Sequence, residues 1–155
     1  MSLKLYYRNS TGSYVEVSAS LDYTSPIRTI HNGKDGDLKV TELYLHNDSS
    51  PSLWYSNIAI RPRDLQDANP YGDVSYTETG WGIKLSPGGV EPTASEWEDL
   101  DWGEQISMDD IGSDSASDVA TYYPFWYLIT CPPNTNAQNK QDIVLDVLYT
   151  ENAVT

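Results

Sequence analysis

The chain has 155 residues, of which 23 are acidic and 9 are basic, so its formal net charge is −14. This length suits a single domain, residues 1–155, with a hydrophobic core of its own. The charge argues against nucleic acid and anionic membranes as partners, because binding to either depends on lysine and arginine; a cationic partner or simple solubility fits better.

Short strands separated by turn residues are predicted for the N-terminal part. Leu3–Arg8 and Tyr14–Ser18 should form a hairpin, because the residues between them are typical turn formers. Another short strand is expected at Pro26–Ile30, followed by a turn rich in asparagine and glycine. The apolar residues of the next strand, Leu38–Asn47, change parity, which indicates either a bulge near Thr41-Glu42 or burial of both faces.

The middle of the chain continues this pattern. Leu53–Ile60 alternates aromatic and β-branched residues with polar ones, which predicts a strand packed on at least one face. Arg61–Asp73 contains two prolines and a glycine and is expected to be irregular. Val74–Thr77 and Gly80–Leu85 are predicted short strands. The residues of the second that should share a face are Trp81, Ile83 and Leu85.

The clearest helical signal lies in Pro92–Leu100. Thr93 and Glu96 have the spacing of a capping box, in which the threonine hydroxyl accepts from the glutamate amide and the carboxylate reaches back. Trp97 and Leu100 would share one face of the helix. We therefore expect one short helix near residues 93–100.

Three further strands are predicted in the rest of the chain. Asp101–Asp118 is acidic and rich in serine and glycine, which predicts a solvated loop containing a short strand at Gln105–Met108. Ala120–Thr130 is apolar on both parities and should be a central strand, with Pro124 at its start or at a bulge. Ile143–Tyr149 is the last predicted strand. Its core-facing residues would be Ile143, Leu145, Val147 and Tyr149.

About eight to ten short strands with frequent turns favour an all-β fold, a single antiparallel β-sandwich of jelly-roll or immunoglobulin-like type. The only cysteine, Cys131, excludes an internal disulfide and is expected to be a buried free thiol. The N-terminus is not expected to be a signal peptide, because no apolar h-region follows Lys4, and no apolar run is long enough to span a bilayer. We therefore expect a soluble protein made in the cytoplasm.

Motifs for catalysis or metal binding are weak. His31 and His46 lack metal-ligand spacing and are expected to be surface histidines. Acidic residues with glycine turns at 99–103 and 109–114 leave calcium open as a cofactor, although neither segment matches an EF-hand. A glycosidase pair is disfavoured because carboxylates this dense are typical of a solvated face. The densest group is Glu96, Glu98, Asp99, Asp101 and Glu104.

The chain has 12 tyrosines and 5 tryptophans but only 1 phenylalanine. Tyrosine and tryptophan combine an apolar body with a polar tip, so they suit either a sandwich core or an interaction surface. Exposed tryptophans on a β-sandwich could stack on sugar rings, so a carbohydrate-binding module is the alternative function. Its candidate residues are Trp54, Trp81, Trp97, Trp102 and Trp126.

Segments 42–62, 80–100 and 122–151 share an order of landmark residues. These are Leu43-Tyr44 with Asn47-Asp48, Trp81 with Lys84, Pro92-Thr93 with Glu96-Trp97, and Pro124-Phe125-Trp126. In this order they resemble small β-sandwich structural proteins of tailed-bacteriophage virions. The resemblance implies a non-enzymatic tail or baseplate component or a capsid decoration protein, made in the cytoplasm of a bacterial host and incorporated into the virion.

The same resemblance implies other virion proteins as partners, in a homo-oligomer or symmetric array on the particle, with a host glycan as a further ligand. Strand addition through chain ends is one way in which such subunits dock. The candidate arms are Met1–Leu5 and Tyr149–Thr155, for which frayed ends are the other explanation.

Overall fold

The computed structural model describes residues 3–17, 37–49, 51–64, 82–131 and 143–155. All the strands in these ranges belong to two antiparallel sheets. The five-stranded sheet has the order β2-β1-β3-β7-β5, with bounds β1 Leu3–Arg8, β2 Tyr14–Glu16, β3 Asp37–Asn47, β5 Gly82–Pro87 and β7 Tyr123–Cys131. The three-stranded sheet has the order β6-β4-β8, with bounds β4 Leu53–Asp64, β6 Ile106–Met108 and β8 Ile143–Ala153.

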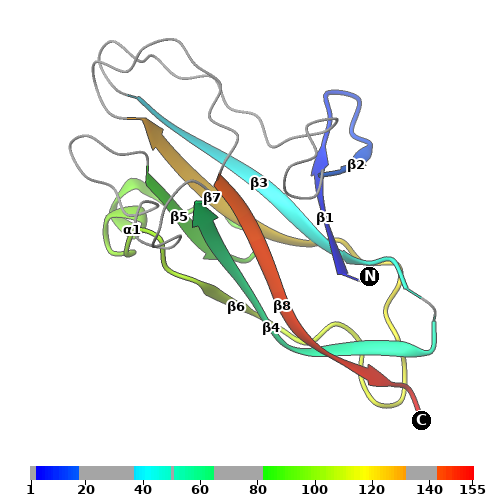
Figure 1. The fold of residues 1–155 in the computed structure, drawn as a ribbon. Coiled ribbons are helices and arrows are strands. Elements are labelled where there is room, and N and C mark those ends of the chain that lie inside the picture. The colour runs from blue at the N-terminus through cyan, green and yellow to red at the C-terminus, as the bar shows by residue number, and fades with distance from the viewer. Residues whose placement is uncertain (1–2, 18–36, 50, 65–81, 132–142) are drawn as a thin grey trace.

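The two sheets pack face to face, with β4 and β8 in one layer and β3 and β7 in the other (Figure 1). One group of buried residues joins Leu43 of β3 and Phe125 of β7 to Ile60 of β4. A second joins Leu45 of β3 to Tyr55 of β4. Because both groups contain residues from both sheets, the core lies between the layers. The all-β sandwich predicted from the sequence is confirmed.

Strand β3 shows which explanation of its parity change is correct. Its pairing with β7 runs without interruption from Asp37↔Cys131 to Leu45↔Tyr123, so the bulge predicted near Thr41-Glu42 is wrong. Every residue from Leu43 to Asn47 is buried. Both faces of this half of the strand are therefore covered, which was the other explanation. As predicted, β7 is an interior strand, between β3 and β5.

A bulge does occur in β4. The register with β8 shifts between Ser56 and Ala59, and Asn57 adopts a φ of 52°. Asparagine tolerates this left-handed conformation better than most residues. The extra residue reverses the inside and outside faces of the strand. Tyr55 and Ile58, which have opposite parity, therefore both reach the core.

Strand β4 is also longer than predicted, because it continues through Pro62 to Asp64. Pro62 pairs with Leu145 of β8 but lies beyond Ile60, the last residue that pairs with β6. Proline is tolerated where one side of a strand has no neighbour. The prediction of irregular structure from Arg61 onward is therefore wrong for the first four residues.

The predicted helix is present as α1, Ala94–Glu98. Thr93 and Glu96 form the capping box, and the backbone amide of Thr93 lowers the pKa of the Glu96 carboxyl by donating to it. Lys84 of β5 is buried beneath this region, where its Nζ donates to the Trp97 carbonyl at 2.8 Å and lies 4.4 Å from the centre of the Trp102 ring. The helix and the following loop thus cover the outer face of β5.

The chain ends described by the structure are parts of the sheets. Leu3–Leu5 pairs with β3, and β8 continues past the predicted Tyr149 to Ala153. The amide of Val154 donates to Ser52, and that of Thr155 donates to Asp114. Frayed ends are therefore the wrong explanation, and neither end is a free arm over these residues. The predicted strands Pro26–Ile30 and Val74–Thr77 lie outside the described residues.

Candidate functional site

Aromatic and charged side chains gather on the outer face of the five-stranded sheet, where β1, β2 and β3 meet the segment leading into β7. They lie outside because Leu3, Leu5, Leu43 and Leu45 occupy the alternate, inward positions. We call this group the tyrosine–histidine cluster. Its members are Lys4, Tyr6, Arg8, Tyr14, Glu16, Tyr44, His46, Asp48 and Tyr122.

Five rings interlock in the cluster. Tyr122 is stacked on Tyr14 at a centroid distance of 3.7 Å and on His46 at 4.0 Å. Two near-parallel rings so close to one centroid must occupy its opposite faces, so Tyr122 lies between them. Tyr6 meets Tyr122 edge-on at 5.2 Å, and Tyr44 meets Tyr14 edge-on at 5.0 Å. These are the arrangements that aromatic pairs prefer, and together they fix the rings relative to one another.

Charged groups surround the rings. The Arg8 guanidinium lies 5.2 Å from the centre of the Tyr14 ring, within cation–π range. Lys4 lies 3.4 Å from a carboxylate oxygen of Glu16 and 3.9 Å from one of Asp48. The cluster is therefore aromatic at its centre and carries both signs of charge at its rim.

His46 is held at both ring nitrogens. Nδ1 lies 2.5 Å from Asp48 Oδ1, and Nε2 lies 3.0 Å from the Val119 carbonyl oxygen. Both partners, a carbonyl and a carboxylate, are hydrogen-bond acceptors, so each ring nitrogen faces a group that accepts. While these bonds hold, neither nitrogen is available as a general base or metal ligand.

Asp48 is one of the two acidic residues of the cluster, with Glu16. Burial alone would raise the pKa of its carboxyl, but hydrogen bonds from Tyr6 and His46, with the attraction of His46 and Lys4, lower that pKa. Burial, the hydrogen bond to Asp48 and the nearby carboxylates raise the pKa of the Tyr6 hydroxyl. At neutral pH the Tyr6 hydroxyl therefore stays protonated and donates to an ionised Asp48.

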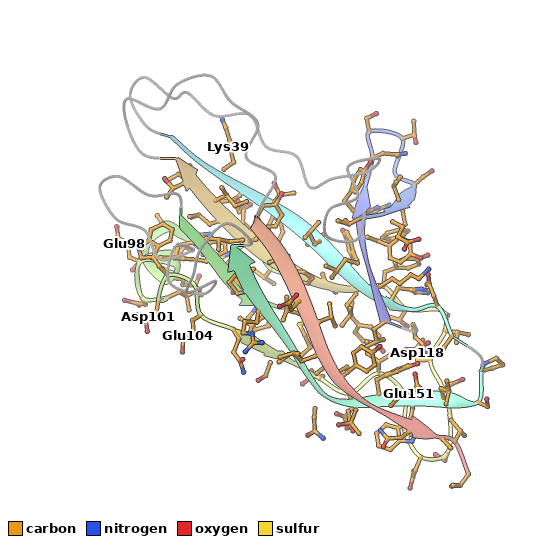
Figure 2. All side chains as sticks on the ribbon, in the orientation of Figure 1. Lys39, Glu98, Asp101, Glu104, Asp118 and Glu151 are labelled. Carbon is orange, nitrogen blue, oxygen red and sulfur yellow. The ribbon has the colours of Figure 1, made fainter. Side chains whose placement is uncertain are left out.

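A second aspartate orders the loop that carries the Val119 carbonyl. Asp118 Oδ1 accepts from the amides of Ala120 at 3.1 Å and Thr121 at 3.0 Å, and the Tyr123 hydroxyl donates to Oδ2 at 2.5 Å. Figure 2 shows Asp118 near the ends of β1 and β3. The loop is thus tied down on both sides of the carbonyl that His46 contacts.

The hydrogen bonds of Asp118 predict a loss of stability in acid. Burial raises the pKa of its carboxyl, but the bonds from Tyr123, Thr121 and Ala120 outweigh burial and bring the pKa down to about 2, below its ordinary value of 3.8. A carboxyl with a depressed folded-state pKa stabilises the protein fully above its unfolded pKa, and this stabilisation is lost as the pH falls towards 2. We expect Asp118→Asn to lower the free energy of unfolding by about 1 kcal/mol at pH 7, after allowance for solvent screening.

Chemical denaturation at pH 7 and at pH 2.5 checks this prediction. The difference between wild type and Asp118→Asn should shrink at the lower pH, because the carboxyl of the unfolded chain is then protonated and folding must release this proton, which removes most of the stabilisation. Asp109→Asn, at an exposed aspartate, is the matched control and should show little effect at either pH. A difference for Asp118→Asn that stays constant between the two pH values would contradict the assignment.

The expectation that His46 is a surface histidine is wrong, since it is only 9% exposed. Tyr122 and Val119, which lie some 75 residues further along the chain, cover it. The alternation Tyr44, His46, Asp48 was the available signal, because it places three polar or aromatic side chains in line at the outer face of β3 and its end. His31 lies outside the described residues.

The tryptophans proposed for sugar stacking do not form one platform. Trp97 is the buried residue of α1, and Trp102 packs against Lys84 of β5. Trp126 lies on β7 in the five-stranded sheet, and Trp54 lies on β4 in the other sheet.

The burial of the indole N–H groups gives no support to sugar binding by these tryptophans. The indole nitrogens of Trp54, Trp97 and Trp126 are buried and make no hydrogen bond within the part of the chain that the structure describes. They are therefore not presented to a ligand's hydroxyls. Trp81 lies outside the described residues. Carbohydrate binding through these residues stays a prediction.

The acidic residues near α1 form a solvated face, as predicted. Figure 2 shows Glu98, Asp101 and Glu104 pointing outward around the helix, and all of them are exposed. Among the described residues, no group of three or more His, Cys, Asp or Glu side chains is placed to hold a metal ion. The acidic segments at 99–103 and 109–114 therefore give calcium no support.

Comparison of the chain with protein-family models, with curated protein sequences and with solved structures found no match. In the described ranges, no helix has the length and apolar character needed to cross a membrane. The tyrosine–histidine cluster is thus the candidate site on structural grounds alone.

Proposed function

We propose that the protein is a non-enzymatic structural subunit of a tailed-phage virion, a tail or baseplate component or a capsid decoration protein, which acts by docking on other virion proteins. The order of landmark residues, which resembles that of such proteins, supports the assignment of the chain to a virion. The tyrosine–histidine cluster is the observation that supports docking.

The cluster has the composition of a protein-binding surface. Tyrosine and arginine are enriched where proteins meet, and residues of these kinds dominate binding energies. Tyr14 is 36% exposed, and charges of both signs from Lys4, Arg8 and Glu16 surround the rings. This arrangement matches the apolar centre and polar rim of a typical interface.

The cluster is also ordered before any partner arrives. The stacked rings of Tyr14, Tyr122 and His46 and the bonds of Asp48 hold the side chains in one arrangement. Less side-chain entropy is then lost on binding, which favours affinity. His46 uses both nitrogens for this internal support, which suits a docking surface better than a catalytic centre.

Mass spectrometry of purified particles of the phage that encodes the chain tests the virion role. The chain should be present in the particles and should stay with them through density-gradient purification. Its absence from such particles would contradict the proposal, whatever the protein does on its own.

Replacing Tyr14 with alanine tests the docking surface separately. We expect this substitution to reduce incorporation into particles on the order of tenfold, because an aromatic contact at a binding surface contributes more than about 1 kcal/mol. Val90→Ala is the matched control, since Val90 is 84% exposed and lies outside the cluster. Thermal unfolding of each variant checks that the fold is kept. Normal incorporation of a folded Tyr14→Ala variant would exclude the cluster as the docking surface.

A further inference from the structure

The described sheets have four edges, of which three are short or covered. β2 and β6 have 3 residues each. At β5, the amide of Gly103 donates to the Ile83 carbonyl at 2.8 Å, so the loop after α1 covers this edge. The fourth edge is β8, which has 11 residues and, among the described strands, only β4 as a neighbour. Figure 1 shows β8 running along the outside of its layer towards the C-terminus.

Strand β8 has only some of the features by which proteins usually prevent pairing at an edge: two acidic residues, Asp146 and Glu151, lie on either side of its middle, and Glu151 accepts from the core residue Tyr55. Its sequence, IVLDVLYTENA, has no proline and no lysine, and the bulge of this sheet lies in β4. Near its middle, Leu148 is 39% exposed and stands opposite Ala59 on the outer face of the sheet. A long, regular edge strand with an exposed apolar residue at its centre is a template for another strand.

We propose that β8 pairs with β8 of a second copy of this chain, antiparallel and about a two-fold axis at Leu148. The two three-stranded sheets then become one continuous sheet. The inference goes beyond the docking proposed above, because it uses another surface and another partner.

The order of residues in β8 favours this register. With the axis at Leu148, the two leucines face each other and Val147 faces Tyr149, an aromatic and β-branched pair that stabilises neighbouring strands. Asp146 then stands opposite Thr150. Moving the axis by half a residue towards the C-terminus would place Asp146 opposite Glu151, which like-charge repulsion disfavours.

Charge opposes the association at long range, because each copy carries a net charge of −14. Salt screens repulsion between charges that lie more than about 8 Å apart at physiological ionic strength, and most charges of the two copies are separated by more than this. The dimer is therefore expected to tighten as salt is added. Binding of a cationic partner at the same edge would instead weaken.

Sedimentation of the full chain over a range of concentrations tests the proposal. Wild type should form dimers, and Leu148→Lys and Leu148→Asp should each raise the dimer dissociation constant on the order of tenfold or more, because like charges meet at the axis. An equimolar mixture of the two variants should restore dimers, because the lysine then faces the aspartate. Val90→Lys, far out on an exposed loop, is the matched control and should dimerise like wild type.

Three results would overturn the proposal: a wild-type chain that stays monomeric, Leu148 variants that dimerise like wild type, or a mixture no better than either variant alone. If a Leu148 variant does not fold, hydrogen exchange of the wild type decides, since amides of β8 should become better protected as concentration rises. None of these results bears on incorporation into particles, so the proposed docking function stands or falls separately.

Discussion

Replacing Tyr55 with alanine is expected to lower the free energy of unfolding by about 3–5 kcal/mol, the range for removing a fully buried aromatic side chain. Tyr55 has no exposed surface and packs with Leu45 of β3 and Ile58 of β4. Its ring meets that of Tyr149 edge-on at 5.2 Å, and its hydroxyl donates to Glu151 at 2.9 Å. The side chain therefore joins both sheets, and its removal leaves a cavity between them.

Tyr55→Phe separates the ring from the hydroxyl. This variant keeps the packing but leaves the Glu151 carboxylate without this donor, so we expect a loss of about 1–2 kcal/mol. Urea denaturation of both variants at neutral pH measures the two contributions. If Tyr55→Ala were no less stable than Tyr55→Phe, the ring would not be part of the core and the bulge at Asn57 would be misplaced.

Replacing Gly112 with alanine is expected to lower the free energy of unfolding by about 2–4 kcal/mol, through backbone strain and overpacking together. Its φ is +84°, a backbone conformation that residues other than glycine rarely adopt. A Cβ there would lie 2.9 Å from both the Ala116 carbonyl oxygen and Trp54 Cβ, and 3.2 Å from the Asp118 amide. Two of these neighbours are backbone atoms and cannot move aside as a flexible side chain would.

Gly88→Ala is the matched control for this substitution. Gly88 has a φ of +97°, but a Cβ there would meet no atom within 4 Å among the described residues. Backbone strain alone should then lower its stability by about 1–2 kcal/mol. Thermal or chemical unfolding of the two variants measures the difference, which reports the crowding at Gly112. Equal losses would mean that the loop adapts and that the close contacts have no effect.

The sequence alone predicted those elements whose signals lie within a few residues of one another. The hairpin of β1 and β2 followed from its turn, and α1 followed from the spacing of Thr93 and Glu96. The interior position of β7 followed from apolar residues on both of its parities. Turn chemistry, capping and strand periodicity are local properties, so they can be read without knowing the neighbours of each element.

Local signals failed where a partner distant in the chain decides the outcome. The bulge at Asn57 was not predicted, because alternation in Leu53–Ile60 looks regular until its register with β8 is known. The last residues of β8, Glu151–Ala153, have weak strand propensity and are strand because they pair with the start of β4.

An acidic, all-β chain that folds as two antiparallel sheets around an aromatic and aliphatic core could be predicted from the sequence, because strand periodicity and turn residues are local properties. Three features depend on the packing of the whole domain: His46 is buried with both nitrogens bonded, Lys84 lies under α1, and β8 forms the long edge. Each of these depends on which strands become neighbours and in what register. Pairing between residues so distant in sequence is settled by packing of the whole domain, which no single segment encodes.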